Sequence, residues 1–416
     1  FNGRSESFRV DKTDMVLSAH QPKSVLLKVL FEPNTFVSDS ATYDITAWSL
    51  PYAHGLQAYA TKESIKPETT LIPESTVSAS TVSNPVAYIA NWNSIADVKF
   101  LAELLNNNIK VRYSEIPFET SGRRFNAGSL IITRNGNSAI NGGFEKTVNE
   151  IAKKSGIGLF AIPTAFVDKG ADLGSSKVRF IKKPRVVVVG GESVSSLSLG
   201  EIWHFFEQEI GYPVTVVRPQ DLNMINWNEF DVLIYPDGSY SEMGNEKMLQ
   251  WIRGGGKLIA MKNAVSELAG KKGFDLKNKE DAKKGDKDIY EDLKAYEQRE
   301  RENVSTNIPG AIYKVDLDNT HPLGFGFPNF YYTLKLDDKV YKYLTGGWNV
   351  GIIKKENYVT GFVGVQAKKK LIDGLIFGVQ EMGNGSVVYL DDNPLFRGFW
   401  ENGKLLFSNA VFMVGH

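Results

Sequence analysis

Two side chains at helical spacing are of the types that bind a metal ion. His204 and Glu207 form the pattern H-x-x-E, and His321 lies further along the chain. Zinc accepts imidazole and carboxylate ligands, and residues i and i+3 share one face of a helix. The pattern therefore makes His204 and Glu207 candidate zinc ligands. The aromatic residues on both sides favour the alternative, in which His204 belongs to an amphipathic helix and is hydrogen-bonded locally.

A second set of polar residues follows the ends of predicted strands. Its members are Glu192, Ser193, Glu201, Asp237, Tyr240, Lys262 and Asn263, with His204 and Arg397 as further candidates. Ligands of open α/β sheets bind beyond the carboxyl ends of the strands, so a site for a small molecule or a peptide end is expected here. The turn Gly190-Gly191 could bind an anion at a helix N-terminus, although Glu192 disfavours phosphate. The alternative is that the glycines make a tight turn and the polar residues cap helices.

The composition removes several kinds of chemistry. The 416 residues include no cysteine, which excludes disulfides, thiolate metal sites and thiol nucleophiles. Lysine and arginine number 48, as do aspartate and glutamate, so charge gives no argument for a nucleic-acid partner. No apolar run reaches the roughly 18 residues of a membrane-spanning helix. We therefore expect neither a nucleic-acid partner nor a membrane span, and the missing thiols fit an oxidising compartment.

Aromatic residues are numerous and allow two interpretations. They make up 12% of the chain and include Trp92, Trp348 and Trp400, with a cluster of Phe325, Phe327, Phe330, Tyr331 and Tyr332. Such side chains could line a surface that binds a peptide or a glycan. Aromatic residues belong more often to the core, and the core interpretation is the favoured one.

The elements that position the polar residues begin at Pro184. Predicted strands cover Arg185–Val189, Val214–Val217, Phe230–Tyr235 and Lys257–Met261, and helices cover Leu199–Ile210, Lys247–Arg253 and Ala264–Ala269. This alternation predicts an α/β domain with a doubly wound, mostly parallel sheet. Later strands are expected at Ala311–Leu317, Leu371–Gly378 and Gly385–Leu390. The charged stretch near 270–303 reads as a surface insertion, with a docking face as the alternative.

A smaller α/β domain is expected before this one. Strands are predicted at Val86–Ile89, Lys110–Tyr113, Leu130–Thr133 and Gly158–Ile162, with helices at Ile95–Leu105 and Phe144–Lys154. The order indicates a βαβ-type unit. The predicted division is 1–83 (a partial N-terminal segment ending in a linker), 84–183 and 184–416. Because Phe1 is not an initiator and no signal peptide follows it, we expect a processed product or a segment of a longer chain.

The order of elements from Pro184 to Val414 resembles the class I glutamine amidotransferase fold, a flavodoxin-like arrangement. In that family a cysteine nucleophile occupies the sharp turn after the strand that corresponds to Lys257–Met261. Here Lys262 or Asn263 takes its place. The family's late His-x-Glu pair corresponds to Leu390–Pro394, which contains no histidine. The resemblance therefore implies a scaffold from which the whole catalytic apparatus has been lost.

A second resemblance extends over the whole chain. It rests on Tyr43–Pro51, Asn91–Ser94, Gly128–Ile132 and Gly200–Glu207, which are similar to segments of a bacterial secreted zinc carboxypeptidase family. In that family a carboxypeptidase A-like domain comes first, and an amidotransferase-like domain follows. No sequence of the catalytic domain is found here. The resemblance implies an accessory region whose partner is its own upstream peptidase domain, with zinc bound there and no cofactor in this chain.

Three hypotheses follow. The leading one is a non-catalytic accessory region, or pseudoenzyme, of a secreted zinc metallopeptidase, located outside the cell, in the periplasm or in the cell envelope. It would pack against the peptidase or bind a peptide or glycan. The second is a small-molecule hydrolase that uses the strand-end residues, and the third is a free-standing ligand-binding protein. No catalytic residue is assigned from the sequence.

Overall fold

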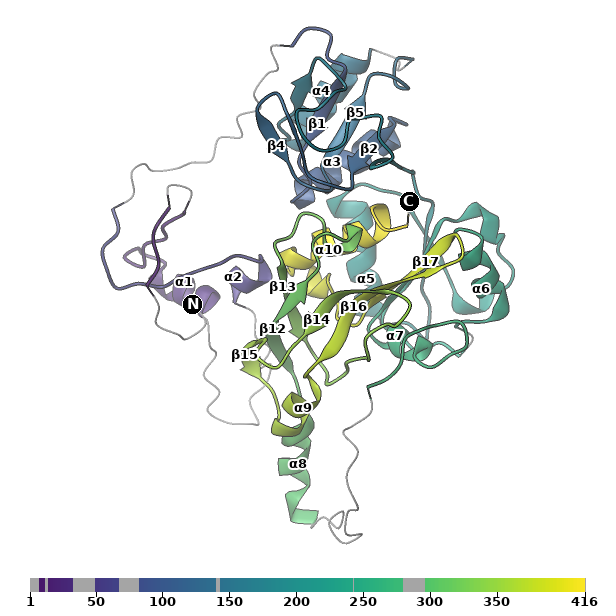
Figure 1. The fold of residues 1–416 in the computed structure, drawn as a ribbon. Helices are drawn as coiled ribbons and strands as arrows, with labels where there is room; N and C mark the ends of the chain where they lie inside the picture. Colours follow the sequence, from purple (N-terminus) through teal and green to yellow (C-terminus); the bar gives the residue numbers. More distant parts are fainter. Residues whose placement is uncertain are drawn as a thin grey trace.

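The computed structural model describes residues 7–11, 14–32, 49–66, 82–139, 143–241, 243–279 and 296–415. Two sheets account for most of the strands, a five-stranded sheet and a ten-stranded sheet. Figure 1 shows the smaller sheet above the larger one, with the C-terminal helix between them. Parts of the predicted linker, of the charged insertion and of the segment Tyr43–Pro51 lie outside the described residues.

The five-stranded sheet is antiparallel throughout. Its strands are β1 (Ala87–Ala90), β2 (Val111–Ser114), β5 (Leu130–Thr133), β6 (Phe160–Ile162) and β7 (Val178–Ile181), in the order β6-β1-β5-β2-β7. The prediction of a βαβ-type unit is corrected here, because β5 lies between β1 and β2 and pairs antiparallel with both. Alternating strands and helices in a sequence do not reveal that a later strand inserts between two earlier ones.

Two helices and a hairpin accompany this sheet. They are α3 (Ile95–Asn106), α4 (Phe144–Ser155) and the pair β3 (Phe118–Thr120) and β4 (Arg123–Phe125). Ser94 caps α3, since its side chain accepts from the backbone N–H of Asp97 and donates to the Asp97 carboxylate. The apolar residues at helical spacing on α3 are buried, as their periodicity predicts.

The ten-stranded sheet has a parallel part and an antiparallel part. The parallel part is β9-β8-β10-β11-β17, formed by β8 (Val186–Val189), β9 (Val214–Val217), β10 (Val232–Tyr235), β11 (Lys257–Met261) and β17 (Gly385–Leu390). The antiparallel part continues through β16 (Gly374–Met382), β14 (Trp348–Ile353), β12 (Gly310–Leu317) and β13 (Phe330–Lys335), and β15 (Tyr358–Phe362) pairs with β12. The chain is therefore a mixed α/β protein, and its large sheet is mixed instead of mostly parallel.

Helices cover both faces of the parallel part. Alternate residues of the strands fall into two separate cores: Val186 and Val188 join one, and Val187 and Val189 join the other. The first core contains apolar residues of α5 (Ser196–His204) and α10 (Glu401–Phe412). The second contains those of α6 (Glu246–Arg253) and α7 (Asn263–Leu268). Strands buried on both faces explain the continuous β-branched run in the sequence.

Helix α10 joins the two sheets. Every residue from Gly403 to Phe412 is buried, and the helix contacts α3 of the smaller unit (Figure 1). The indole N–H of Trp92 donates to the side-chain oxygen of Asn409 over 2.7 Å. The Asn409 amide nitrogen donates in turn to the carbonyls of Leu323 and Phe325. The side-chain amide of Asn409, whose oxygen and nitrogen are both hydrogen-bonded, therefore connects three parts of the chain.

The remaining helices are short. They are α1 (Ser24–Phe31), α2 (Leu50–Ala53), α8 (Arg299–Thr306) and α9 (Val365–Lys370). Helix α8 belongs to the predicted charged insertion, and none of its residues is buried. Among the described residues, no helix is both long and apolar enough to cross a membrane.

Candidate functional site

The turn after β11 has a strained backbone at a single residue. Lys262 adopts φ 52° and ψ −122° at the start of α7, and its N–H donates to the carbonyl of Leu390. A residue with a Cβ rarely occupies this left-handed region, and the strain costs about 1–3 kcal/mol. A strained strand-to-helix turn is the feature that exposes a nucleophile at the top of a sheet. Of the two residues proposed for that place, Lys262 is the one that occupies it.

The ammonium group of Lys262 is held by a carboxylate. Its Nζ lies 2.5 Å from Oδ2 of Asp337, and its side chain is only 9% exposed. Burial alone would lower the pKa of Lys262, but Asp337 and the more distant Asp392 and Asp391 together raise it above its usual range. Lys262 is therefore a protonated, ion-paired group. A nucleophile needs a free lone pair, which this arrangement removes.

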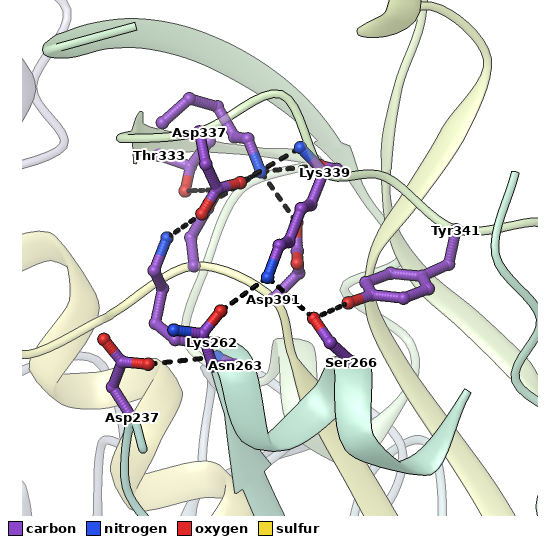
Figure 2. Close-up of polar contacts among 11 residues, drawn as sticks. Asp237, Lys262, Asn263, Ser266, Thr333, Asp337, Lys339, Tyr341 and Asp391 are labelled. Carbon is purple, nitrogen blue, oxygen red and sulfur yellow. Dashed lines mark hydrogen bonds and ion pairs between the residues drawn. The ribbon is translucent and has the colours of Figure 1, made fainter. Parts of the chain in front are cut away.

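Lys262 belongs to a larger buried ion cluster, which consists of Lys262, Lys335, Asp337, Asp391 and Asp392. Nζ of Lys335 lies 2.7 Å from Oδ2 of Asp391, 3.0 Å from Oδ1 of Asp392 and 3.5 Å from Oδ1 of Asp337. The side chain of Lys335 has no exposed surface. The cluster gathers at the carboxyl ends of β11 and β17 and the end of β13 (Figure 2).

The buried ion cluster holds more carboxyl groups than ammonium groups. Three aspartates face two lysines, so a neutral cluster requires one additional proton on a carboxyl group. The surrounding lysines outweigh burial at Asp337 and lower the pKa of its carboxyl. At Asp391 burial dominates over the attraction of Lys335 and raises the pKa to about 7. Oδ1 of Asp391 also has no hydrogen-bond partner. Oδ1 of Asp392 shares this lack of a partner, so the raised pKa is what makes Asp391 the carboxyl of the cluster that can take up the proton near neutral pH.

A polar rim borders the cluster and consists of Asp237, Asn263, Ser266, Lys339 and Tyr341. Figure 2 shows Nζ of Lys339 between the Asn263 side-chain oxygen, at 2.5 Å, and Oγ of Ser266, at 2.9 Å. The hydroxyls of Ser266 and Tyr341 lie 2.9 Å apart, and the N–H of Asn263 donates to Asp237. A serine beside a lysine is a pairing that can perform acyl transfer. Burial raises the pKa of Tyr341, so its hydroxyl stays protonated and does not act as a base.

The other predicted strand-end residues do not join the rim. Glu201 accepts from the Asn393 amide and from the backbone N–H of Arg397, and burial raises its pKa. Glu192 and Ser193 are exposed. Tyr240 is buried and donates to the carbonyl of Pro236. Asp237, Lys262 and Asn263 are thus the predicted residues that the structure brings to one place.

The predicted metal ligands have other partners. Glu207 accepts from the indole of Trp203, and Nδ1 of His204 lies 3.2 Å from Oε1 of Glu209. The expected helix continues past α5 as a turn of π-helix over Phe205–Glu209, which brings Glu209 next to His204. The ring of His321 accepts from the N–H of Leu323, and burial lowers its pKa to about 4. Among the described residues, no three histidine or acidic side chains are grouped so as to hold a metal.

The aromatic residues are divided between core and surface. Trp92 and Trp400 are buried, which agrees with the core interpretation, whereas Trp348 is 53% exposed. A hollow of about 530 Å³ is lined by residues of the loop 165–175, including Phe166 and Asp172. No residue of the buried ion cluster or of the polar rim lines it, so it offers no argument about their chemistry.

Sequence reasoning missed Lys335, Asp337 and Lys339. The three residues follow the aromatic run Phe330–Tyr332, whose composition suits the core or a binding surface and does not indicate a strand of the sheet. One signal was present, because Thr333 and Lys335 alternate with apolar residues and so share one face of β13. Asp391 and Asp392 were recognised only as a place where a histidine is missing. Their role depends on β13 reaching the end of β17, which no local pattern reveals.

Comparisons with known proteins give structural neighbours only. No family model and no curated protein matches this chain. A glutamine amidotransferase from Thermotoga maritima has a TM-score of 0.34 and 10% identity, over 55% of this chain and 97% of that chain. One from Methylobacillus flagellatus has a TM-score of 0.27 and 10% identity, over 55% and 94%. A β-galactosidase from Bacillus circulans has a TM-score of 0.33 and 12% identity, over 55% and 30%.

These scores are too low to support an argument by themselves. The structural neighbours include glutamine amidotransferases. None of the three neighbours named above is a carboxypeptidase. The strand order and the strained turn at Lys262 are therefore the observations on which a functional proposal depends.

Proposed function

We propose that this chain is a non-catalytic accessory region of a secreted zinc carboxypeptidase, with an amidotransferase-like part that packs against the peptidase or binds its substrate. The observation that supports the loss of catalysis is the ion pair at the strained turn. Lys262 stands at the nucleophile place, and its ammonium group is engaged by Asp337 at 2.5 Å. In this proposal the turn joins the parallel part of the sheet to the segment after β13 through the Lys262–Asp337 ion pair.

The neighbouring groups support the same proposal. A working nucleophile needs an adjacent base, and the position of that base at the end of β17 holds Asp391 and Asp392. Both carboxyl groups are buried against Lys335, with their side chains 1% and 2% exposed. A base in this position has neither access to a substrate nor a free nucleophile to activate. The buried groups bind one another in place of a substrate.

An activity assay on the purified chain tests the loss of catalysis. We expect no release of ammonia from glutamine and no cleavage of peptides. Lys262→Ala serves as the matched variant and Lys146→Ala as the surface control, because the Lys146 side chain is 72% exposed. Turnover that Lys262→Ala abolishes and Lys146→Ala preserves would overturn the proposal.

The association with a peptidase rests on sequence resemblance. Of the segments that carry it, Asn91–Ser94 contains Trp92, which is buried against Asn409, and Gly200–Glu207 belongs to α5 and the π-helix. The reading frame upstream of Phe1 is expected to encode a zinc-binding peptidase domain. Zinc is expected there, and the two parts should purify as one secreted protein. An open reading frame that begins just before Phe1, or an upstream region without zinc ligands, would refute this association.

A hydrolase that acts on small molecules remains the second candidate, and the polar rim is the observation that favours it. Ser266 lies 2.9 Å from Nζ of Lys339 and is partly exposed. A fluorophosphonate reagent would label Ser266 if this serine were an activated nucleophile. We expect no labelling of the wild-type chain. Labelling that disappears in Ser266→Ala and decreases in Lys339→Met would favour the hydrolase over the accessory role.

A further inference from the structure

One lysine–aspartate pair inside the cluster is shielded from water and has a second carboxyl group beside it. Lys335 ends β13 and Asp391 follows β17, and the pair joins positions 56 residues apart. Their side chains are 0% and 1% exposed, and the nitrogen-to-oxygen distance is 2.7 Å. Asp392 lies 3.0 Å from the same nitrogen and is 2% exposed. Amine, acid and proton acceptor are thus in contact with one another.

The two lysine–aspartate pairs of the cluster differ in the state of the acid. Asp337, the partner of Lys262, is an ionised carboxylate because the neighbouring lysines lower its pKa. Carboxylates resist attack by amines. Burial has the opposite effect on Asp391 and raises its pKa to about 7, so its carboxyl group takes up a proton near neutral pH. Of the two pairs, Lys335–Asp391 is therefore the one whose acid can be protonated while it contacts the amine.

We propose that Lys335 and Asp391 are joined in the folded protein by an amide bond between Nζ and Cγ, and that Asp392 moves the proton in its formation. This modification site goes beyond the proposed accessory role. It needs no cofactor, and its reactants are the side chains already in contact. A cross-link of this kind also suits a chain without cysteine, which cannot form a disulfide.

The reaction balances in atoms and charge. The carboxylates around Lys335 overcome the effect of burial and raise its pKa, so the amine begins as an ammonium group. Asp392, oriented by a hydrogen bond from Thr333, accepts one proton from it. The free amine attacks Cγ of Asp391, the Nζ–Cγ bond forms, and a C–O bond breaks. The hydroxyl leaves as water with a second amine proton, and Asp392 keeps the first.

The burial of the pair favours the product. An amide is neutral and the reaction leaves Asp392 protonated, whereas the starting Lys335 ammonium and Asp392 carboxylate are charged and are costly to hold away from water. The same exclusion of water protects the amide from hydrolysis. The bond can form only after β13 and the end of β17 have come together, so the unfolded chain does not react.

Mass spectrometry of the whole chain under denaturing conditions tests the proposal. The expected mass is lower than that of the sequence by one water molecule. Trypsin should fail to cleave after Lys335, because an acylated lysine is not a substrate, and it should still cleave after Lys262. The peptides that contain Lys335 and Asp391 should be recovered as one branched species. The full mass calculated from the sequence, together with cleavage after Lys335, would overturn the proposal.

Variants distinguish this bond from other losses of water. Asp392→Asn keeps the reacting pair but removes the proton acceptor, so the full mass should return while the circular dichroism stays native. Lys335→Arg should also have the full mass. A succinimide at Asp392 gives the same mass as the cross-link but leaves cleavage after Lys335 intact, and finding it would refute the proposal. A bond located instead between Lys262 and Asp337 would refute the assignment.

Discussion

At the scale of single residues, Lys262 combines a backbone strain with a buried charge. The strain comes from its Cβ in the left-handed region, at φ 52° and ψ −122°, and the charge is held by Asp337. Glycine has no Cβ and adopts such angles freely. The two contributions can therefore be separated by substitutions that remove the ammonium group and differ only in whether a Cβ remains.

We predict that Lys262→Gly is more stable than Lys262→Ala. Both variants lose the ion pair with Asp337, but only alanine keeps the strain, which is worth about 1 kcal/mol or more. Urea unfolding of the two variants measures the difference. Equal midpoints would mean that this turn carries no strain.

Lys257 is a second buried lysine, located at the start of β11. Its Nζ donates to the carbonyls of Ala410 and Val411 in the last turn of α10. Burial, followed by the smaller effect of Lys182, lowers its pKa from 10.5 to about 7. The unfolded chain therefore binds a proton at Lys257 that the folded chain releases between these two values.

The lowered pKa of Lys257 determines how the free energy of unfolding changes with pH. Because the unfolded state holds more protons between pH 7 and 10.5, the contribution of Lys257 to stability decreases as the pH falls through this window. We predict that Lys257→Met removes this slope. Unfolding free energies of the wild type and the variant, measured from pH 7 to 10, provide the test. A variant that keeps the wild-type slope would assign it to other groups.

At the scale of elements, two helical glycines have opposite surroundings. A Cβ on Gly200 of α5 would meet nothing within 4 Å. A Cβ on Gly403 of α10 would lie 1.9 Å from the carbonyl oxygen of Pro394, a distance that no side chain can occupy. Gly403 is thus required for the close approach of α10 to the segment after β17, whereas Gly200 is not required by packing.

The same substitution should have opposite effects at these sites. Gly200→Ala is expected to stabilise the protein by about 0.5–1 kcal/mol, because alanine has the higher helix propensity. Gly403→Ala should destabilise it by about 1–3 kcal/mol through the forced shift of α10. Thermal unfolding of the two variants measures both effects. Stabilisation by Gly403→Ala would show that α10 does not lie this close to Pro394.

The sequence predicted elements better than it predicted their arrangement. Apolar runs located β8, β10 and β11 to within a few residues, because a strand buried on both faces leaves a continuous apolar signature. The run Val214–Val217 located β9 as well, although this edge strand is not buried. Strands β13, β14 and β15 were missed, and for β13 the reason is that its aromatic residues also suit an exposed binding surface. Strand pairing was beyond local patterns. For this reason Lys262 and Asn263 were placed at the site, while their partners Asp337 and Lys339 were not.

At the scale of the whole molecule, Asn409 connects the two sheets. It accepts from Trp92 of the smaller unit and donates to the carbonyls of Leu323 and Phe325. All of these groups are buried. Replacing the amide by an apolar group would leave several polar atoms without partners, and each such atom costs about 1–3 kcal/mol.

Asn409→Leu is therefore expected to destabilise the protein by at least about 2 kcal/mol. Trp92→Phe removes the indole donor that Asn409→Leu would leave without an acceptor. The double variant Trp92→Phe/Asn409→Leu should therefore lose less unfolding free energy than the sum of the losses in the two single variants. Denaturant unfolding of all four proteins completes this double-mutant cycle. Strictly additive losses would show that Trp92 and Asn409 do not interact.

The bond between Trp92 and Asn409 also has a consequence for how the chain folds. It closes a separation of 317 residues, and α10 supplies part of the core on which the preceding parallel strands pack. Contacts of such long range slow folding, since the entropy of a very large loop must be lost before the contact forms. On the ribosome, the strands of both sheets emerge before the helix that covers them. The apolar faces of these strands stay exposed until α10 has been synthesised. During this interval the nascent chain must be protected from aggregation.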